Sequence, residues 1–126
     1  MNVKQRRFLD RAKECILARG FNGARLTDLT VDLGVPYQAV KAIVDLGVAE
    51  HEIFEIADGQ MYTSDSLREV EASLREFAMD GRLSVPIVRD HFQSSRSVTE
   101  ALLEYLDSEG TTVRGPEGRT FKANKT

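Results

Sequence analysis

Basic side chains recur at regular intervals in the second half of this 126-residue sequence. Arg82, Arg89 and Arg96 follow one another every seven residues, and Arg114 and Arg119 flank a predicted turn near the C-terminus. A guanidinium binds phosphate through a fork of N–H donors, and the same fork can bind the O6/N7 edge of a guanine. The pattern therefore favours contact with a nucleic acid.

Arg96 is the strongest single candidate in this set. It follows Ser94 and Ser95, which are good N-cap residues, so it falls in the first turn of a predicted helix. Free backbone N–H groups and the positive end of the helix dipole favour a phosphate at that place. We therefore expect Ser94, Ser95 and Arg96 to bind together, with Arg89 close by in sequence.

The same arginines also permit a purely structural interpretation. They can be ordinary surface residues, some of them paired with Asp90, Glu100 or Glu117. The spacing by itself supports the two interpretations about equally.

Catalytic chemistry is not expected from this sequence. His51 and His91 lie 40 positions apart without a cysteine that could complete a metal site, and Cys15 falls on the apolar face of a predicted helix. The sequence has no glycine-rich phosphate loop, no GxSxG and no HExxH. We expect a binding protein that is not an enzyme and that uses no metal or cofactor.

Composition indicates an ordinary globular protein, with 41% hydrophobic and 29% charged residues. A single cysteine excludes a disulfide framework, and no apolar run approaches the roughly 18–20 residues of a membrane span. We therefore expect a soluble, cytoplasmic chain with no membrane partner.

The net charge of −3 argues at first against nucleic acid as a partner. However, the charge is unevenly distributed: the chain from Gly81 onward has seven basic and six acidic residues, against 10 and 14 before it. The total therefore averages over two different halves.

Hydrophobic periodicity and turn residues predict the same order of elements twice, namely three helices followed by a β-hairpin. The first set comprises a helix at 3–19, a short helix capped by Thr27, and a third helix at 37–46 that ends at Gly47. Its hairpin arms are at 52–56 and 60–63. The second comprises a helix from a Ser64 or Ser66 cap to Met79, a short helix capped by Ser84, a helix from Ser94 or Ser95 to Gly110, and hairpin arms at 111–114 and 119–123.

The two halves also match weakly in sequence, at an offset of 57 to 59 residues. Arg25-Leu26-Thr27 corresponds to Arg82-Leu83-Ser84 in this comparison. Three helices closed by a hairpin are typical of a winged helix, so we predict a mostly α fold with small β-hairpins, made of two tandem winged-helix domains. Residues 1–63 are expected to pack against the second domain or to act as a spacer, because their third helix carries only Lys41 and Asp45 as charges. Residues 64–126 are expected to bind the nucleic acid.

A recognisable pattern runs through the second half, formed by Arg89-Asp90, Ser94-Ser95-Arg96, Leu102-Leu103-Glu104-Tyr105-Leu106-Asp107, Thr112, Arg114 and Glu117-Gly118-Arg119. With these residues, the segment 89–119 resembles the last winged helix of the bacterial selenocysteine-specific elongation factor, the SelB type. Residues 29–62 resemble the preceding winged helix more loosely. Ser97-Val98 stands where the family commonly has Lys-Tyr, and Pro116-Glu117-Gly118 replaces its Gly-Asp.

The resemblance implies a function in translation. In that family the C-terminal winged helices hold a hairpin of the selenoprotein mRNA, the selenocysteine insertion element, while the factor delivers selenocysteyl-tRNA to a UGA codon on the ribosome. This chain would be the RNA-holding region, and GTP would be expected only in the N-terminal part of the parent factor. Arg96 would be the main RNA-reading residue with Ser95 beside it, Arg114 and Arg119 would be wing contacts, and the region would act as a monomer.

Two other classes of function remain open at this point. One is a winged-helix DNA-binding transcriptional regulator, which would insert its third helix into a major groove, although Glu100 and Glu104 on that helix would repel phosphates. The other is a protein-interaction module, which an exposed apolar surface on the third helix of the first set would favour.

Overall fold

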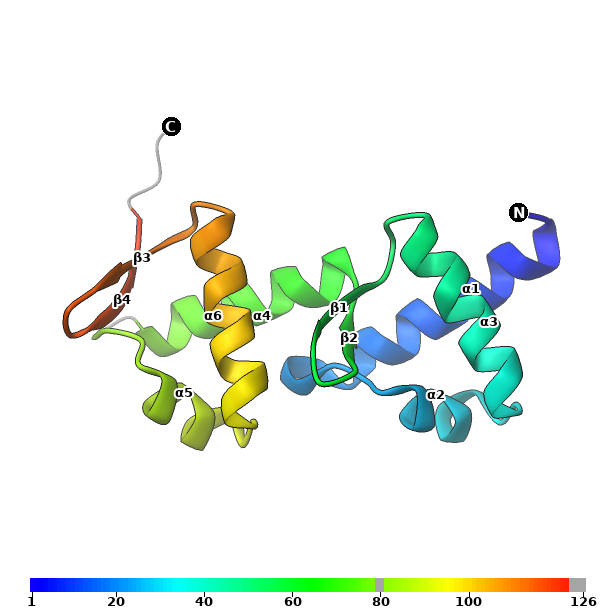
Figure 1. Cartoon of the computed structure of the whole chain (residues 1–126), viewed down its shortest axis with the longest axis horizontal. Helices are drawn as coiled ribbons and strands as arrows, with labels where there is room; N and C mark the ends of the chain where they lie inside the picture. The colour runs from blue at the N-terminus through cyan, green and yellow to red at the C-terminus, as the bar shows by residue number, and fades with distance from the viewer. Residues whose placement is uncertain (79–80, 123–126) are drawn as a thin grey trace.

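The computed structural model describes residues 1–78 and 81–122 as a mostly helical protein with two small antiparallel hairpins (Figure 1). The expected order of elements is confirmed, while the predicted ends at Met79 and Ala123 lie outside the described residues. No helix among these residues has both the length and the apolar character needed to cross a membrane. The elements are α1 (Val3–Ala18), η1 (Gly20–Asn22), α2 (Leu26–Leu33), α3 (Tyr37–Ala49), β1 (Phe54–Ala57), β2 (Gln60–Tyr62), α4 (Ser64–Phe77), α5 (Val85–Phe92), α6 (Arg96–Ser108), β3 (Thr112–Gly115) and β4 (Gly118–Phe121).

Short hydroxyl side chains begin the helices of the second half. Ser84 and Ser95 cap α5 and α6 as predicted, and the Ser95 hydroxyl accepts the Val98 N–H at 3.1 Å. α4 is capped by Thr63 rather than by Ser64 or Ser66. Thr63 and Ser66 exchange two hydrogen bonds between side chain and backbone, which satisfies two N–H groups at this helix end.

The start of α2 also differs from the prediction. Arg25 is its N-cap residue, and Thr27 lies inside the helix. The Arg25 N–H donates to the Asp28 carboxylate at 2.9 Å, so a single hydrogen bond to a side chain of the first turn replaces the expected hydroxyl cap.

Gly47 does not end α3, which continues to Ala49. A Cβ at this position would lie 2.7 Å from Cδ1 of Ile53 and 2.8 Å from Cδ1 of Leu9. Glycine is therefore needed here because two buried side chains occupy the space, and not because the helix stops.

Two hydrophobic clusters form the core. The first joins α1, α2 and α3 to the first hairpin, and the second is centred on α4, α5 and α6. Tyr62, the last residue of β2, is fully buried in the second cluster, and Phe54 of β1 packs against it. The first hairpin therefore contributes to the core of the second half.

Further contacts join the halves. The rings of Phe21 and Phe92 stack with centroids 4.1 Å apart and planes 7° apart. The Tyr62 hydroxyl donates to the Phe21 carbonyl at 2.8 Å, and burial raises the pKa of this phenol. β1 packs against α6, so the first hairpin lies between α3 and α6 (Figure 1).

The structure corrects the register of the internal repeat. Arg25 and Ser84 are equivalent N-cap residues, as are Pro36 and Ser95, and both pairs are 59 residues apart. The sequence match of Arg25 with Arg82 is therefore shifted by two positions. Each half also closes with one isolated antiparallel bridge: Ala24 with Met61, and Leu83 with Arg119.

Candidate nucleic-acid interface

The N-terminus of α6 has the geometry expected of an anion site. Ser95 caps it in an extended backbone conformation, and the Thr99 hydroxyl donates to the Ser95 carbonyl at 2.7 Å. The Ser94 hydroxyl lies 3.4 Å from the same carbonyl, as donor. These contacts fix the helix start, while the first-turn N–H groups keep the polarity that favours a phosphate.

Arg96 is the first residue of α6, and its side chain is 76% exposed. Its Nε donates to the Glu100 carboxylate at 3.0 Å, across one helical turn. A surface pair of this kind contributes little stability, about 0.3–0.5 kcal/mol. A phosphate or a guanine edge can therefore replace Glu100 at the guanidinium.

A carboxylate that sequence reasoning missed lies at the same helix end. Asp58, in the turn between β1 and β2, accepts a hydrogen bond from the Ser97 hydroxyl. Asp58 has φ of 53°, which places it in the left-handed region of a tight turn. The first hairpin thus brings a negative charge to the first turn of α6, where it competes with an incoming phosphate for the same positive helix end.

The hairpin β3–β4 places its two arginines differently from the prediction. Arg114 and Arg119 are opposite each other in the antiparallel ladder, and Arg114 is exposed. Arg119 is 5% exposed, and its Nε donates to Asp107 at 2.8 Å. We expected Arg119 to be a wing contact like Arg114, but its guanidinium does not lie at the surface, because the carboxylate of Asp107 binds it inside the fold.

Asp107 organises the base of this hairpin from α6. It accepts the Thr112 hydroxyl at 2.5 Å in addition to the Arg119 guanidinium. Burial alone would raise the pKa of the Asp107 carboxyl, but these two hydrogen bonds and the charges of Arg119 and Arg114 bring it below its ordinary value. Asp107 therefore remains a carboxylate that holds β3 and β4 against the helix.

The remaining arginines of the seven-residue series are paired. Arg89 is partly buried in the last turn of α5, and its Nε donates to Asp90 at 3.1 Å. Arg82 contacts Glu117 in the turn of the second hairpin. Together with Arg96 and Glu100, these contacts confirm the pairing with Asp90, Glu100 and Glu117 that the structural interpretation of the series predicted.

The predicted residues do not all form one contiguous patch. Ser94, Ser95 and Arg96 are adjacent at the start of α6, and Arg114 lies on β3. In Figure 1 the start of α6 and the tip of the β3–β4 hairpin lie on either side of α5. A ligand that contacts both must therefore extend across the face formed by α5.

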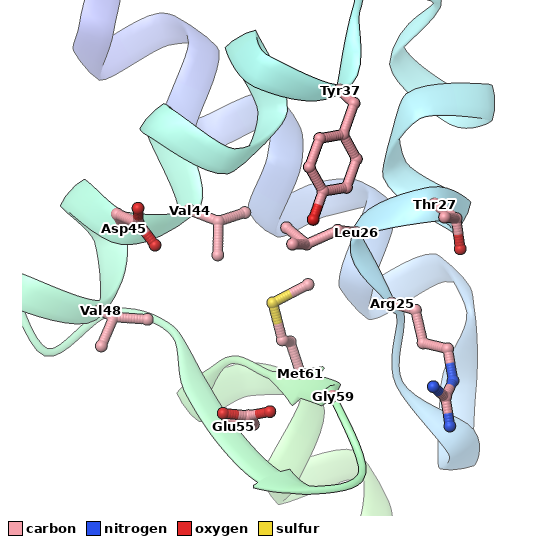
Figure 2. A pocket seen from close by; sticks show the side chains of 10 residues that line it. All are labelled: Arg25, Leu26, Thr27, Tyr37, Val44, Asp45, Val48, Glu55, Gly59 and Met61. Atoms are coloured by element: carbon pink, nitrogen blue, oxygen red, sulfur yellow. The ribbon is translucent and has the colours of Figure 1, made fainter.

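The equivalent surface of the first half has different chemistry. Tyr37 begins α3 at the position that Arg96 holds in α6, and it lines a pocket of about 420 Å³ between α2, α3 and the first hairpin. Figure 2 shows the Tyr37 ring directed toward Leu26 and Met61, with Asp45 and Glu55 at the rim. Arg25 also lines the pocket, but the two carboxylates outnumber it above an apolar floor, which makes this pocket a poor site for phosphate.

Comparison with known proteins agrees with the fold. Residues 75–121 match the family model described as "Elongation factor SelB, winged helix". No curated protein matches the sequence significantly.

Two of the solved structures that resemble this chain match nearly all of it. One is the mRNA-binding domain of elongation factor SelB from E. coli in complex with SECIS RNA, with 20% identity, a TM-score of 0.65 and coverage of 98% of this chain and 100% of that one. The other is the bacterial selenocysteine-specific elongation factor EF-Sec, with 22% identity and a TM-score of 0.60; the match covers 97% of this chain but 19% of that protein. At these identities the two structures show a shared fold. Together with the family match over residues 75–121, they show that the chain is similar to the C-terminal winged-helix region of SelB.

Proposed function

We propose that this chain is the mRNA-binding region of a selenocysteine-specific elongation factor. It would bind the hairpin of a selenoprotein mRNA and so tether the factor for selenocysteine incorporation at UGA. The observation that carries the proposal is the family match over residues 75–121, the segment that contains Arg96 at an exposed, capped helix start. The similar E. coli domain is described in complex with SECIS RNA, which supports the same class of ligand.

The organisation we propose is two winged-helix modules, residues 1–63 and 64–126. The equivalent caps, the equivalent bridges and the repeated element order support this division. The first module would pack against the second and act as a spacer. Its surface at the start of α3 carries Tyr37, Asp45 and Glu55, where the second module has an exposed arginine at the start of α6. The second module would hold the RNA.

In the proposed complex, Arg96 exchanges Glu100 for the RNA. An A-form stem hides its major groove, so sequence is read on loop bases that leave the stack. The Arg96 guanidinium would bind such a base or its phosphate, and Ser94 and Ser95 would orient the backbone at the helix start. Arg114, and Arg89 after release from Asp90, would add phosphate contacts, while Arg119 would act by positioning the hairpin.

The proposal assigns binding and no catalysis to this region. We propose that it acts as a monomer in the cytoplasm and without a cofactor of its own. The GTPase, the selenocysteyl-tRNA site and the ribosome contacts would belong to the parent factor, of which a chain like this spans about a fifth, as the 19% coverage of EF-Sec illustrates.

A DNA-binding regulator is not supported by the comparisons. The middle of α6 also disfavours a major groove, because Glu100 and Glu104 lie on it and would face phosphates. Binding through the helix start and the second hairpin is compatible with those charges.

A mobility-shift titration tests the proposal, with a bacterial selenocysteine insertion hairpin, the same stem with a scrambled loop, and duplex DNA of equal length. We expect preference for the hairpin, and Arg96→Ala to reduce its affinity about ten-fold or more, within the 1–3 kcal/mol of a bidentate base contact. Arg68→Ala is the matched control, since Arg68 is an exposed helical arginine paired with Asp65 on α4. Equal binding of all three nucleic acids would overturn the proposal, and equal reductions on both RNAs would show that Arg96 contacts only phosphate.

A further inference from the structure

Most of the basic side chains in the described parts of the chain form ion pairs. Each of these has a carboxylate oxygen within 4.0 Å, so its charge is already compensated locally. They are Arg6, Lys13, Arg19, Lys41, Arg68, Arg75, Arg82, Arg89, Arg96 and Arg119.

Three exposed cations without such a partner among the described residues lie together on α1. Lys4, Arg7 and Arg11 follow one another at intervals of three and four residues, so their side chains share one side of the helix. We call these three residues the α1 basic face. Lys4 and Arg11 are about 10 Å apart along the axis at about 1.5 Å per residue.

The nearby carboxylates do not neutralise this face. Asp10 and Glu52 are held by Arg6, and Glu52 also accepts Lys13 at 2.8 Å. Glu14 is exposed on α1, three residues beyond Arg11, and so lies only at the end of this face. An excess of positive charge therefore remains in solvent.

The equivalent first helix of the second half lacks this property in its described part. α4 carries Arg68 and Arg75, and these pair with Asp65 and Glu71 on the same helix. The α1 basic face is thus specific to the first half, and it is not a general consequence of the repeated fold.

The position of α1 separates this face from the hairpin interface. In Figure 1 the start of α1 lies at one end of the molecule, and the β3–β4 hairpin lies at the other. A ligand held by the start of α6 and the second hairpin therefore leaves the α1 basic face open to a second ligand.

We propose that the α1 basic face binds the phosphodiester backbone of a second RNA segment, distinct from the hairpin. The three cations extend over about 10 Å, which is comparable to the axial length of a few successive phosphates on one strand of a duplex. The guanidinium forks of Arg7 and Arg11 suit paired phosphate oxygens, and no partner carboxylate has to be displaced. Contact through backbone charge alone makes this binding independent of sequence. The inference goes beyond the proposed function, because it adds a second RNA site on the opposite module.

The experiment uses the full chain and a labelled 16-base-pair RNA duplex without a loop, in fluorescence anisotropy over a salt series. Arg7→Gln/Arg11→Gln removes two charges from the face, and Lys41→Gln/Arg68→Gln removes two paired charges from other exposed helices as the matched control. We expect the first variant to bind the duplex about five-fold more weakly or worse. Its salt slope should be shallower by about 1.5, because each phosphate that is no longer neutralised removes about 0.7–0.9 from the slope. The control should stay close to the unchanged chain.

Two further arms fix the class of the ligand and its independence from the hairpin. With one equivalent of unlabelled insertion hairpin, which fills the proposed hairpin site first, the chain should still bind the labelled duplex. Polyglutamate and vesicles with phosphatidylserine should compete far less well than unlabelled duplex. Equal weakening in the two double variants, loss of duplex binding with one equivalent of hairpin, or equal competition by polyglutamate or vesicles would each overturn the proposal.

The outcome of this experiment is separable from that of the proposed function. The duplex has no loop, so its binding is measured on the free chain whether or not the insertion hairpin binds. A chain that binds the duplex through α1 but ignores the hairpin would support the second RNA site and overturn the proposed function.

Discussion

Arg114 and Arg119 lie directly opposite each other in the β3–β4 ladder, yet one guanidinium is in solvent and the other is buried against Asp107. Cross-strand neighbours usually share an environment, because both side chains point to the same side of the ladder. Here the carboxylate of α6 separates them, so the two arginines have different tasks: one is available to a ligand, and one fixes the hairpin.

Replacing these arginines one at a time separates the two tasks. Arg119→Gln leaves the half-buried Asp107 without its charged partner and should lower the free energy of unfolding by about 1–3 kcal/mol. Arg114→Gln should leave stability unchanged and weaken hairpin binding about two- to three-fold, because one phosphate is no longer neutralised. Urea unfolding and a binding titration on both variants measure this; similar stability for the two variants would contradict the structural assignment.

Removing the Asp58 carboxylate should improve RNA binding and reduce stability. Asp58→Asn keeps a residue that tolerates the positive φ of this turn, but it removes the negative charge from the start of α6. We expect hairpin affinity to rise about two- to five-fold and unfolding free energy to fall by about 0.3–1 kcal/mol, the usual range for a charge at a helix end. A hairpin titration and urea unfolding measure the two effects. Asp45→Asn is the control on the first half, and an equal gain there would mean that only net charge matters.

We expect the protein to lose folding stability in acid because of the Glu52 carboxylate. Hydrogen bonds from Arg6 and Lys13 lower its pKa from an ordinary 4.5 to about 2, although partial burial opposes this. Because the folded state lowers the pKa, the stabilisation is complete above the ordinary value and is lost as pH falls from about 5 to about 2. Glu52→Gln should make the urea-unfolding midpoint less dependent on pH across this range. Glu50→Gln, at an exposed neighbouring glutamate, should leave the pH dependence of the midpoint as in the unchanged protein.

Gly47 provides a test of packing inside α3. Gly47→Ala inserts a methyl group within 3 Å of the Ile53 and Leu9 side chains, and overpacking of this kind costs about 1–3 kcal/mol despite the better helix propensity of alanine. Gly81→Ala, where nothing lies within 4 Å of the added carbon, should be close to neutral. Thermal unfolding of both variants distinguishes crowding from a helix-ending role, in which Gly47→Ala would not destabilise.

Local features of the fold could be predicted from the sequence, and long-range contacts could not. Ser84 and Ser95 were predictable as caps because a serine hydroxyl reaches a backbone N–H three residues ahead whatever surrounds it. The Arg25 cap was not, since the interaction comes from Asp28 and leaves Thr27 as ordinary helix. The hairpins followed from alternation and from glycine-containing turns.

For the candidate site, spacing identified the arginines but few of their partners. The i,i+4 contact of Arg96 with Glu100 follows from helix geometry, and it was predictable for that reason. The burial of Arg119 depends on Asp107 twelve positions earlier, and the contact between Asp58 and Ser97 depends on how the first hairpin packs on α6. Such contacts have no local signal, because they exist only once the elements that carry the two residues pack together.

The buried position of Tyr62 restricts how this protein can evolve. Its ring fills the core of the second half, although it belongs to the last strand of the first. A recombination event that carried residues 64–126 into another protein would leave a hole of one aromatic ring in the cluster that contains Leu67 and Val70. The second half therefore cannot be inherited without the strand that ends in Tyr62. The two repeats are expected to persist as a pair, and substitutions at Tyr62 are expected to be compensated on α4 and α6 rather than on α1.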